Sequence, residues 1–406
     1  MTIKKNSGCG CGSVPFSFVL FVLGVSYWWL IYLGNIHQIA RLLPRLPLPA
    51  AISKLLPPSI QPDRSVPTPI ATNKQIPLDP QTITKQPNPT KSVTTPQISP
   101  RSIAPTAWDR KVIRGIYVSR YQITNNADEQ TIRQRVRDYH DRGINTIVHG
   151  VWGNGCTMYD SQVMQQLVGA KSCPNQFQAK WLEWTIDEAH RQGMQVHAYF
   201  EKGIKIDKNS PIFERAVNNK WLVPGVDRTY DRVEHYVLDV EVPAVADLFP
   251  RMLAEFVTKY PTIDAVQWDD YLGYHAELPG NINRTASLTK FVRQMISDMK
   301  AANPKVSFDL CHHNPYWAKR YFAADWQQWP VDRVFIQDYN EKNFQQELDY
   351  AVHYAGLAIT DNQLHRLPAL IANDRIKGIL VFPLAGKPQV TAAQVQKIVR
   401  DNSIPK

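Results

Sequence analysis

Residues 263–274 read IDAVQWDDYLGY, and this stretch decides the fold. A short apolar run that ends in two adjacent carboxylates is typical of a buried strand whose carboxyl end carries function. Because strand side chains alternate between faces, Val266 and Trp268 are expected to face covering helices. Asp269 then points to the opposite face, and Asp270 lies at the mouth of the strand.

Strand-like and helix-like segments alternate on both sides of this stretch, from Trp108 to the end of the chain. The other strand-like segments are 114–121, 145–152, 195–201, 306–311, 333–339, 356–360 and 377–384. The helix-like segments are 128–142, 180–192, 244–260, 287–302, 316–326, 344–354 and 391–400. Eight such units in roughly 250 to 300 residues predict an α/β fold, a closed (β/α)8 TIM barrel over residues 108–406. The seventh unit is the weakest, because 356–360 makes a poor strand.

The N-terminal region predicts a membrane anchor. Residues 14–33 form an uncharged apolar run, and about 20 apolar residues are needed to cross a bilayer. Trp28, Trp29 and Tyr32 near its end are typical interfacial residues. The run is longer than the apolar core of a cleaved signal peptide and lacks its small-residue cleavage site. We therefore expect a short cytoplasmic tail (1–13), an uncleaved transmembrane helix and a barrel on the extracytoplasmic side.

Residues 34–107 are rich in Pro, Thr, Gln, Ser and Lys, a composition that predicts a disordered Pro-rich linker. The chain carries a formal net charge of +10. Much of the excess precedes Trp108, so the basicity belongs to the anchor and the tether. No nucleic-acid partner is expected.

Polar side chains on the third to sixth strands converge in the predicted lumen. By period-two alternation the inward set is His197, Tyr199, Glu201, Ser307, Asp309, Cys311, His313, Gln337 and Tyr339. Burying several carboxylates without a function would be costly. The carboxyl ends of these strands are therefore the candidate site.

Several motifs resemble a known family. RGIYVS (114–119), NTIVHGVWGNGCTMYDS (145–161), VHAYFEKG (196–203) and IDAVQWDDYLGY are similar to the bacterial "family 10 glycosylhydrolase-like" group of envelope proteins. YFAADWQQW, DRVFIQDY and KGILVFPL extend the resemblance over most of residues 111–400. It implies a barrel that acts on glycans, with peptidoglycan glycan strands as one substrate it suggests. Asp338 departs from the pattern, because an apolar residue is expected between Gln337 and Tyr339.

Glycoside hydrolysis needs one protonated carboxyl to protonate the leaving oxygen and one ionised carboxyl to attack, activate water or stabilise positive charge. Asp270 is the expected acid and Asp269 its partner. Glu201 is the alternative nucleophile or base. An adjacent carboxyl pair also suits substrate-assisted cleavage of N-acetyl sugars.

Sugar binding calls for aromatic faces and polar side chains at the strand ends. Trp152 and Tyr271 are the expected aromatic platforms. The other expected substrate-binding residues are His197, Tyr199, Asn154, Asp309, His313, Gln337 and Tyr339. A role for His197 as a lumen histidine without ligand contact is an open alternative.

Two other functions remain open. A metal-dependent hydrolase could use His312, His313, Asp309 and the two aspartates, but no His-x-His pair or His-Glu-x-x-His helix is present. No metal or cofactor is expected. The other alternative is a catalytically inactive barrel that binds cell-envelope glycan as an anchored scaffold.

Cys156 and Cys173 lie in one loop after the second strand. In an oxidising compartment they could form a disulfide. In the chain-entropy model such a bridge stabilises the fold by about 3 kcal/mol. Cys9 and Cys11 precede the apolar run, where free cytoplasmic thiols are expected, and Cys311 is expected to be a buried lumen thiol.

Overall fold

The computed structural model describes residues 105–118, 126–174, 177–228, 234–275, 278–279, 283–354, 356–384 and 386–403. The expected cytoplasmic tail (1–13), membrane helix (14–33) and linker up to residue 104 lie outside these ranges. None of the described helices has the length and apolar character that a membrane span requires.

Eight parallel strands form a closed barrel. They are β1 (Ile113–Val118), β2 (Thr146–Gly153), β4 (Gln195–Phe200), β7 (Ala265–Trp268), β8 (Ser307–His312), β9 (Arg333–Gln337), β10 (Gly356–Thr360) and β11 (Gly378–Phe382). Each pairs in parallel with its neighbours in the order β1-β11-β10-β9-β8-β7-β4-β2, and the β1–β2 pairing closes the ring. The predicted TIM barrel is confirmed for the described residues.

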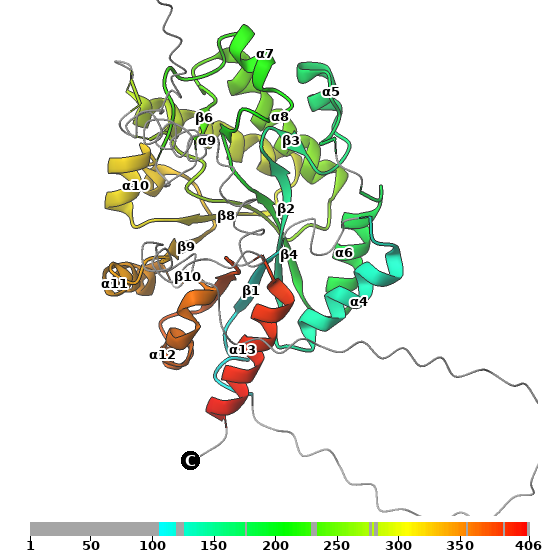
Figure 1. Cartoon of the computed structure of the whole chain (residues 1–406), viewed down its shortest axis with the longest axis vertical. Coiled ribbons are helices and arrows are strands. Elements are labelled where there is room, and N and C mark those ends of the chain that lie inside the picture. Colours follow the sequence, from blue (N-terminus) through cyan, green and yellow to red (C-terminus); the bar gives the residue numbers. More distant parts are fainter. Residues whose placement is uncertain are drawn as a thin grey trace, which may run out of the picture. The chain divides into compact units, whose positions relative to one another are not determined.

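Helices surround the strands as an outer ring (Figure 1). The helices that follow the strands are α4 (Glu129–His140), α6 (Trp181–Arg191), α8 (Pro243–Lys259), α9 (Arg284–Ala302), α10 (Pro315–Phe322), α11 (Phe344–Tyr354) and α13 (Pro388–Ser403). Shorter elements that the sequence did not predict are β3 (Cys156–Thr157), α5 (Gln162–Val168), β5 (Lys205–Ile206), α7 (Phe213–Asn218), β6 (Tyr236–Val237), η3 (Trp326–Gln328), η4 (Asp361–Arg366) and α12 (Leu367–Ala372). Most of these short elements lie within the loops that connect each strand to the helix that follows it.

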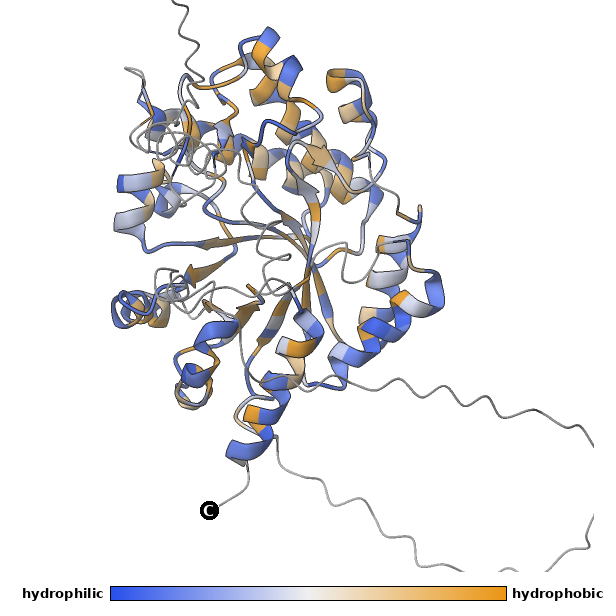
Figure 2. Cartoon of the chain, in the orientation of Figure 1, coloured by the Kyte–Doolittle hydropathy of each residue, from blue (hydrophilic) through white to orange (hydrophobic). Residues whose placement is uncertain are grey.

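The helices form where capping and amphipathic spacing agree. In α4, Asp128 accepts a hydrogen bond from the Thr131 N–H at 2.8 Å, which caps the first turn. Ile132, Val136 and Tyr139 then lie on one face and are buried against the sheet. Figure 2 shows the same pattern around the ring, with apolar strands inside and polar residues alternating along the helices.

Strand side chains divide into two cores, as the alternation predicts. Val266 and Trp268 belong to the large outer core between strands and helices. The small inner core fills the lumen and consists of Ile113, Tyr117, Val148, Tyr199, Cys311, Phe335, Ala358 and Leu380. The lumen is thus packed, and its carboxyl end is the natural place for a site.

The seventh strand is a full member of the barrel, so its description as a poor strand is wrong. All five residues of β10 are buried, and the strand pairs with β11 along its length. Its first residue must be small, because a β carbon on Gly356 would lie 2.3 Å from the Val334 carbonyl oxygen. Close approach of two strands explains the glycine that weakened the pattern.

Trp152 is wrongly predicted as a sugar platform. The β2–β4 register shifts between Gly150 and Trp152, which places Trp152 opposite Phe200. The bulge turns its ring outward, where it is fully buried and packs on Phe249 at a centroid distance of 5.4 Å. Its Nε1 donates to the Gly203 carbonyl oxygen at 2.9 Å. No face of this indole is available to a ligand.

The predicted disulfide is present between Cys156 and Cys173, which are 17 residues apart. Cys156 belongs to β3, which folds back antiparallel on the end of β2. The bridge therefore ties the loop after β2 to the barrel rim. Cys311 is a buried free thiol.

Reduction of this bridge is expected to lower the free energy of unfolding by about 3 kcal/mol, because the open loop gains entropy in the unfolded chain. The measurement is urea unfolding of the wild type with and without reductant, beside the Cys156→Ala/Cys173→Ala double variant. The variant should match the reduced wild type and should not respond to reductant. Equal midpoints for oxidised and reduced wild type would contradict a stabilising bridge.

Candidate active site

Two carboxylates leave the barrel at the end of β7. Asp269 is 7% exposed and Asp270 is 1% exposed. The backbone turns at once, with the Leu272 N–H donating to the Asp269 carbonyl oxygen at 2.9 Å. The Tyr271 N–H donates to Asp269 Oδ1 at 2.9 Å, which fixes that carboxyl over the lumen.

The neighbouring strand β4 supplies the next contacts. The Tyr199 hydroxyl donates to Asp269 Oδ2. Glu201 follows β4 directly, and its Oε2 would lie 3.3 Å from a β carbon placed on Gly150. Gly203 lets the two loops meet, because its φ is +46° and a β carbon there would lie 2.4 Å from the Tyr271 carbonyl oxygen. Glu201 and the aspartate pair are thereby held on adjacent loops.

The electrostatics of the pair favour one bound proton. Burial, followed by the negative charge of Asp270, raises the pKa of Asp269 well above its ordinary range. Hydrogen bonds from Tyr199 and from the Tyr271 N–H oppose this shift, because they stabilise the ionised form. Burial is the larger effect, so the net shift of the Asp269 pKa is upward.

His313 links the pair to a second carboxylate. Its Nε2 lies 4.0 Å from Asp270 Oδ2, and its Nδ1 lies 3.6 Å from Glu347 Oε1. The ring stacks on Phe322 at a centroid distance of 5.4 Å, and 22% of the side chain is exposed. The predicted site residue His313 is therefore brought to the aspartate pair.

Two pockets open at the carboxyl ends of the strands. The first has a volume of about 200 Å³ and is lined by the predicted residues Tyr199 and Glu201, with Tyr117 and Phe382 as further walls. The second has a volume of about 280 Å³, and its lining includes the predicted residues His313, Gln337 and Tyr339. Both pockets are lined by residues at the strand ends that carry the predicted site.

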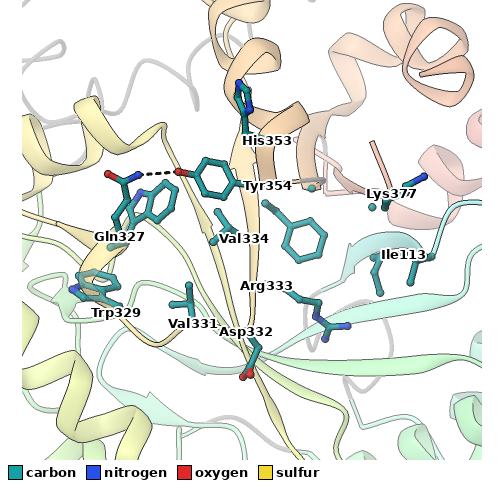
Figure 3. Close-up of a pocket in the computed structure, with 15 residues that line it drawn as sticks. Ile113, Gln327, Trp329, Val331, Asp332, Arg333, Val334, His353, Tyr354 and Lys377 are labelled. Atoms are coloured by element: carbon teal, nitrogen blue, oxygen red, sulfur yellow. Dashed lines mark hydrogen bonds between the residues drawn. The ribbon is translucent and has the colours of Figure 1, made fainter. Parts of the chain in front are cut away.

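A larger pocket, with a volume of about 580 Å³, lies at the other end of the barrel (Figure 3). Its lining includes the first residues of four strands, namely Ile113, Arg333, Gly356 and Gly378. Chemistry in TIM barrels takes place at the carboxyl ends of the strands, so size alone does not make this pocket the active site.

His197 and Asp309 were predicted to bind substrate, and that prediction is wrong because both lie too deep in the lumen. Both side chains are fully buried, with His197 Nδ1 3.3 Å from Asp309 Oδ2. The Arg333 Nε donates to Asp309 Oδ1 at 2.8 Å from the amino end of β9. Burial lowers the pKa of His197. Alternation identified their face correctly, but it carries no information about depth.

Tyr271 and Asn154 have different surroundings. Tyr271 is half-buried at the strand end, where the Lys205 Nζ lies 5.1 Å from its ring centroid. The Asn154 amide donates to Asn209 Oδ1 at 2.8 Å and accepts from the Asp207 N–H at 2.7 Å. Asn154 therefore shapes a loop, and the role of Tyr271 as an aromatic platform stays a prediction.

The structure also adds residues that the sequence did not point to. Lys205 and Asp227 form a fully buried ion pair at 2.7 Å beside the Tyr271 ring. Lys205 lies in the two-residue strand β5, and Asp227 follows 22 residues later outside the named strands and helices, so neither lies in a segment long enough to show a periodic pattern. Tyr117 lines the first pocket and accepts a hydrogen bond from Gln267 Nε2. Alternation along β1 could have identified Tyr117.

Asp338 generates a prediction about pH. Burial, followed by Glu347 and Glu341, raises the pKa of Asp338 from the ordinary 3.8 to about 8. The folded chain keeps this proton where the unfolded chain loses it, so the free energy of unfolding falls as pH rises between these values. Asp338→Asn should remove this component and flatten the dependence. The measurement is urea unfolding of both proteins across this pH window.

Asp349→Asn is the matched control, because Asp349 lies on the same side of the barrel, on α11, and is exposed. It should retain the wild-type pH dependence. If Asp338→Asn and the control show the same slope, a neutral buried carboxyl at Asp338 is contradicted.

Residues 112–285 match the model of the family described as glycosyl hydrolase-like 10. The matched segment runs from the beginning of β1 through Glu201 and the aspartate pair to the beginning of α9. The resemblance that the sequence motifs indicated is thereby confirmed for residues 112–285. The motifs YFAADWQQW, DRVFIQDY and KGILVFPL lie beyond the matched segment. This segment of the barrel is therefore similar to glycosyl-hydrolase-like proteins.

Two named relatives share part of the chain. "Glycosyl hydrolase DigH" of Escherichia coli (strain K12) is 28% identical over 225 residues, which is 48% of this chain and 49% of that protein. DigH of Shigella flexneri matches with the same values. The chain thus spans about half the length of these curated relatives.

Solved structures include more distant likenesses. The GH36 α-galactosidase AgaA of Geobacillus stearothermophilus is 13% identical, with a TM-score of 0.45 over 73% of this chain and 43% of that chain. An α-amylase from Lactobacillus plantarum is 11% identical, with a TM-score of 0.45 over 72% and 80% of the two chains. Likeness of this degree carries no information on substrate.

Proposed function

Starting from the match of residues 112–285 to the glycosyl hydrolase-like 10 family, we propose that this protein is a glycoside hydrolase that cleaves an envelope polysaccharide by carboxylate acid/base catalysis. The observation that carries the proposal is the raised pKa of Asp269, buried beside Asp270 at the carboxyl end of β7. A carboxyl that keeps its proton at neutral pH is what protonation of a glycosidic oxygen requires.

The proposed roles follow from the surroundings of each carboxyl. Asp269 is the general acid, which reverses the order expected from sequence, where Asp270 had that role. Asp270 is the neighbour whose negative charge favours the proton on Asp269. Glu201 is the ionised partner, since it lines the first pocket and acts on Asp269 electrostatically. Tyr199 positions Asp269 through its hydroxyl.

The reaction then has two proton-balanced parts. Asp269 gives its proton to the departing glycosidic oxygen while positive charge develops on the sugar ring. In one route Glu201 attacks the anomeric carbon, and a water that gives a proton back to Asp269 then breaks the bond between the sugar and Glu201. In the other route Glu201 takes a proton from the attacking water, and that proton returns to Asp269 through solvent. Tyr271, half-buried beside the pair, offers the aromatic face on which a sugar ring can rest.

The substrate and location are proposed from the sequence. Residues 14–33 would anchor the chain, with the Pro-rich linker extending the barrel toward the extracytoplasmic side. The Cys156–Cys173 bridge supports an oxidising compartment. Peptidoglycan glycan strands are the polysaccharide that such a location would offer.

The direct test is release of reducing ends from peptide-free glycan strands, intact peptidoglycan and neutral polysaccharides by the purified full chain. Asp269→Asn and Glu201→Gln should each lower kcat/KM by about 100- to 10,000-fold, the usual contribution of a general acid or base. Asp349→Asn is the control and should match the wild type.

Two outcomes would reject the assignment. Glycan binding by all four proteins without product on any substrate would identify a glycan-binding scaffold instead. Turnover that persists in Asp269→Asn and Glu201→Gln would move the chemistry away from these carboxyls.

The pH profile of activity gives a second test, in which two variants should shift the alkaline limb in opposite directions. Activity should fall as pH rises through the raised pKa of Asp269, because the acid loses its proton. Tyr199→Phe removes a hydrogen bond that stabilises the ionised form, so the alkaline limb should move to higher pH. Asp270→Asn removes the neighbouring negative charge, so its limb should move to lower pH. Shifts in the same direction would contradict the proton on Asp269.

A further inference from the structure

The second pocket at the carboxyl end, lined by His313, Trp317, Gln337, Asp338 and Glu347 among others, contains unsatisfied hydrogen-bond acceptors. We call it the acidic subsite. Among the described residues, neither carboxylate oxygen of Asp338 has a hydrogen-bond partner, although only 1% of the residue is exposed. The Gln337 Oε1 is likewise buried and without a hydrogen bond in the described part. Buried polar atoms are normally satisfied, so these atoms point to a missing donor.

The residues that line the acidic subsite indicate what kind of hydrogen-bond donor a ligand would have to supply. Asp338 and Glu347 both line it, while its described lining residues include no lysine or arginine. Arg366 acts on Asp338 from outside the pocket, but its guanidinium pairs with Glu341 at 2.7 Å. A ligand group with several N–H donors and a positive charge would satisfy the acceptors and offset the carboxylates.

The subsite adjoins the proposed catalytic pair. His313 is shared, since its Nε2 lies 4.0 Å from Asp270 Oδ2 while the same ring lines the pocket. Trp317 and Tyr339 are half-buried and give the pocket aromatic walls. Aromatic walls with polar acceptors are typical of a site that holds a sugar ring.

We propose that the acidic subsite binds the ammonium group of a hexosamine that lacks its N-acetyl substituent, next to the glycosidic bond that is cleaved. The substrate class is thus a partly de-N-acetylated amino-sugar polymer. This inference rests on the proposed glycoside hydrolase function for its place in a reaction, but the binding itself does not depend on turnover. Asp338 is the residue that specifies the charge, because an ammonium group bound beside its carboxyl favours the ionised form and so drives off its proton. Glu347 adds a second carboxyl, which accepts hydrogen bonds from the Asn314 N–H and side-chain amide.

The test is isothermal titration calorimetry of the purified full chain with β-1,4-linked glucosamine oligomers and with N-acetylglucosamine oligomers of equal length. The wild type should bind the glucosamine oligomer more tightly. Asp338→Asn, which keeps the shape but removes the carboxyl that ionises beside a bound ammonium group, should weaken glucosamine binding by about 10- to 100-fold, as expected for a hydrogen bond to a charged group. Its affinity for the N-acetylated oligomer should stay unchanged, as should both affinities of Asp349→Asn.

The outcomes separate this inference from the proposed function. Equal affinity of the wild type for both oligomers would overturn the subsite, whatever the variant does. Equal loss of both ligands in Asp338→Asn would overturn it as well. If reducing ends are released from N-acetylated strands while the glucosamine preference is absent, only the subsite fails. If the preference depends on Asp338 but no substrate is cleaved, the subsite stands and the hydrolase function fails.

Discussion

The candidate site depends on one electrostatic constraint, the burial of two adjacent carboxyls at the end of β7. Asp269 and Asp270 are both nearly inaccessible to water. Two like charges so close together in a medium of low dielectric constant cannot both be ionised without a large cost. This cost raises the pKa of Asp269, and a proton held there is what the proposed hydrolysis requires. The Tyr199 hydroxyl and the Tyr271 backbone N–H donate hydrogen bonds that orient the Asp269 carboxyl.

The closed barrel holds the two carboxyls in fixed positions. Closure through the β1–β2 pairing leaves no free edge in the sheet, and the packed lumen below the pair excludes water. The His197, Asp309 and Arg333 cluster occupies the lower lumen, where His197 and Arg333 both lie against the Asp309 carboxylate. Gly203 brings the loop after β4 against the loop after β7. Rigid strands thus set the carboxyl positions, while the surrounding loops define the two pockets.

Periodicity was sufficient to predict the barrel and the inward face of each strand, because both follow from alternation along buried parallel strands. It could not predict the orientation of Trp152, because a bulge inside β2 shifts the register there. It could not give the depth of His197 and Asp309, since depth depends on how neighbouring strands are staggered. The Gly356 strand looked weak because its glycine is required by a close contact with Val334 of the preceding strand β9, which no local pattern reveals. The Lys205–Asp227 pair joins loops without periodic structure, so it could be found only in three dimensions.

The most direct measurement is infrared spectroscopy of the carboxyl C=O stretch in the full chain at neutral pH. The two proteins to compare are Asp338→Asn and the Asp338→Asn/Asp269→Asn double variant. Both lack the Asp338 carboxyl, whose own raised pKa would otherwise contribute a band of a protonated carboxyl. A proton on Asp269 predicts that the band of a protonated carboxyl is present in the single variant and lost in the double variant. Identical spectra would contradict a protonated Asp269 and, with it, the acid that the proposed hydrolysis requires.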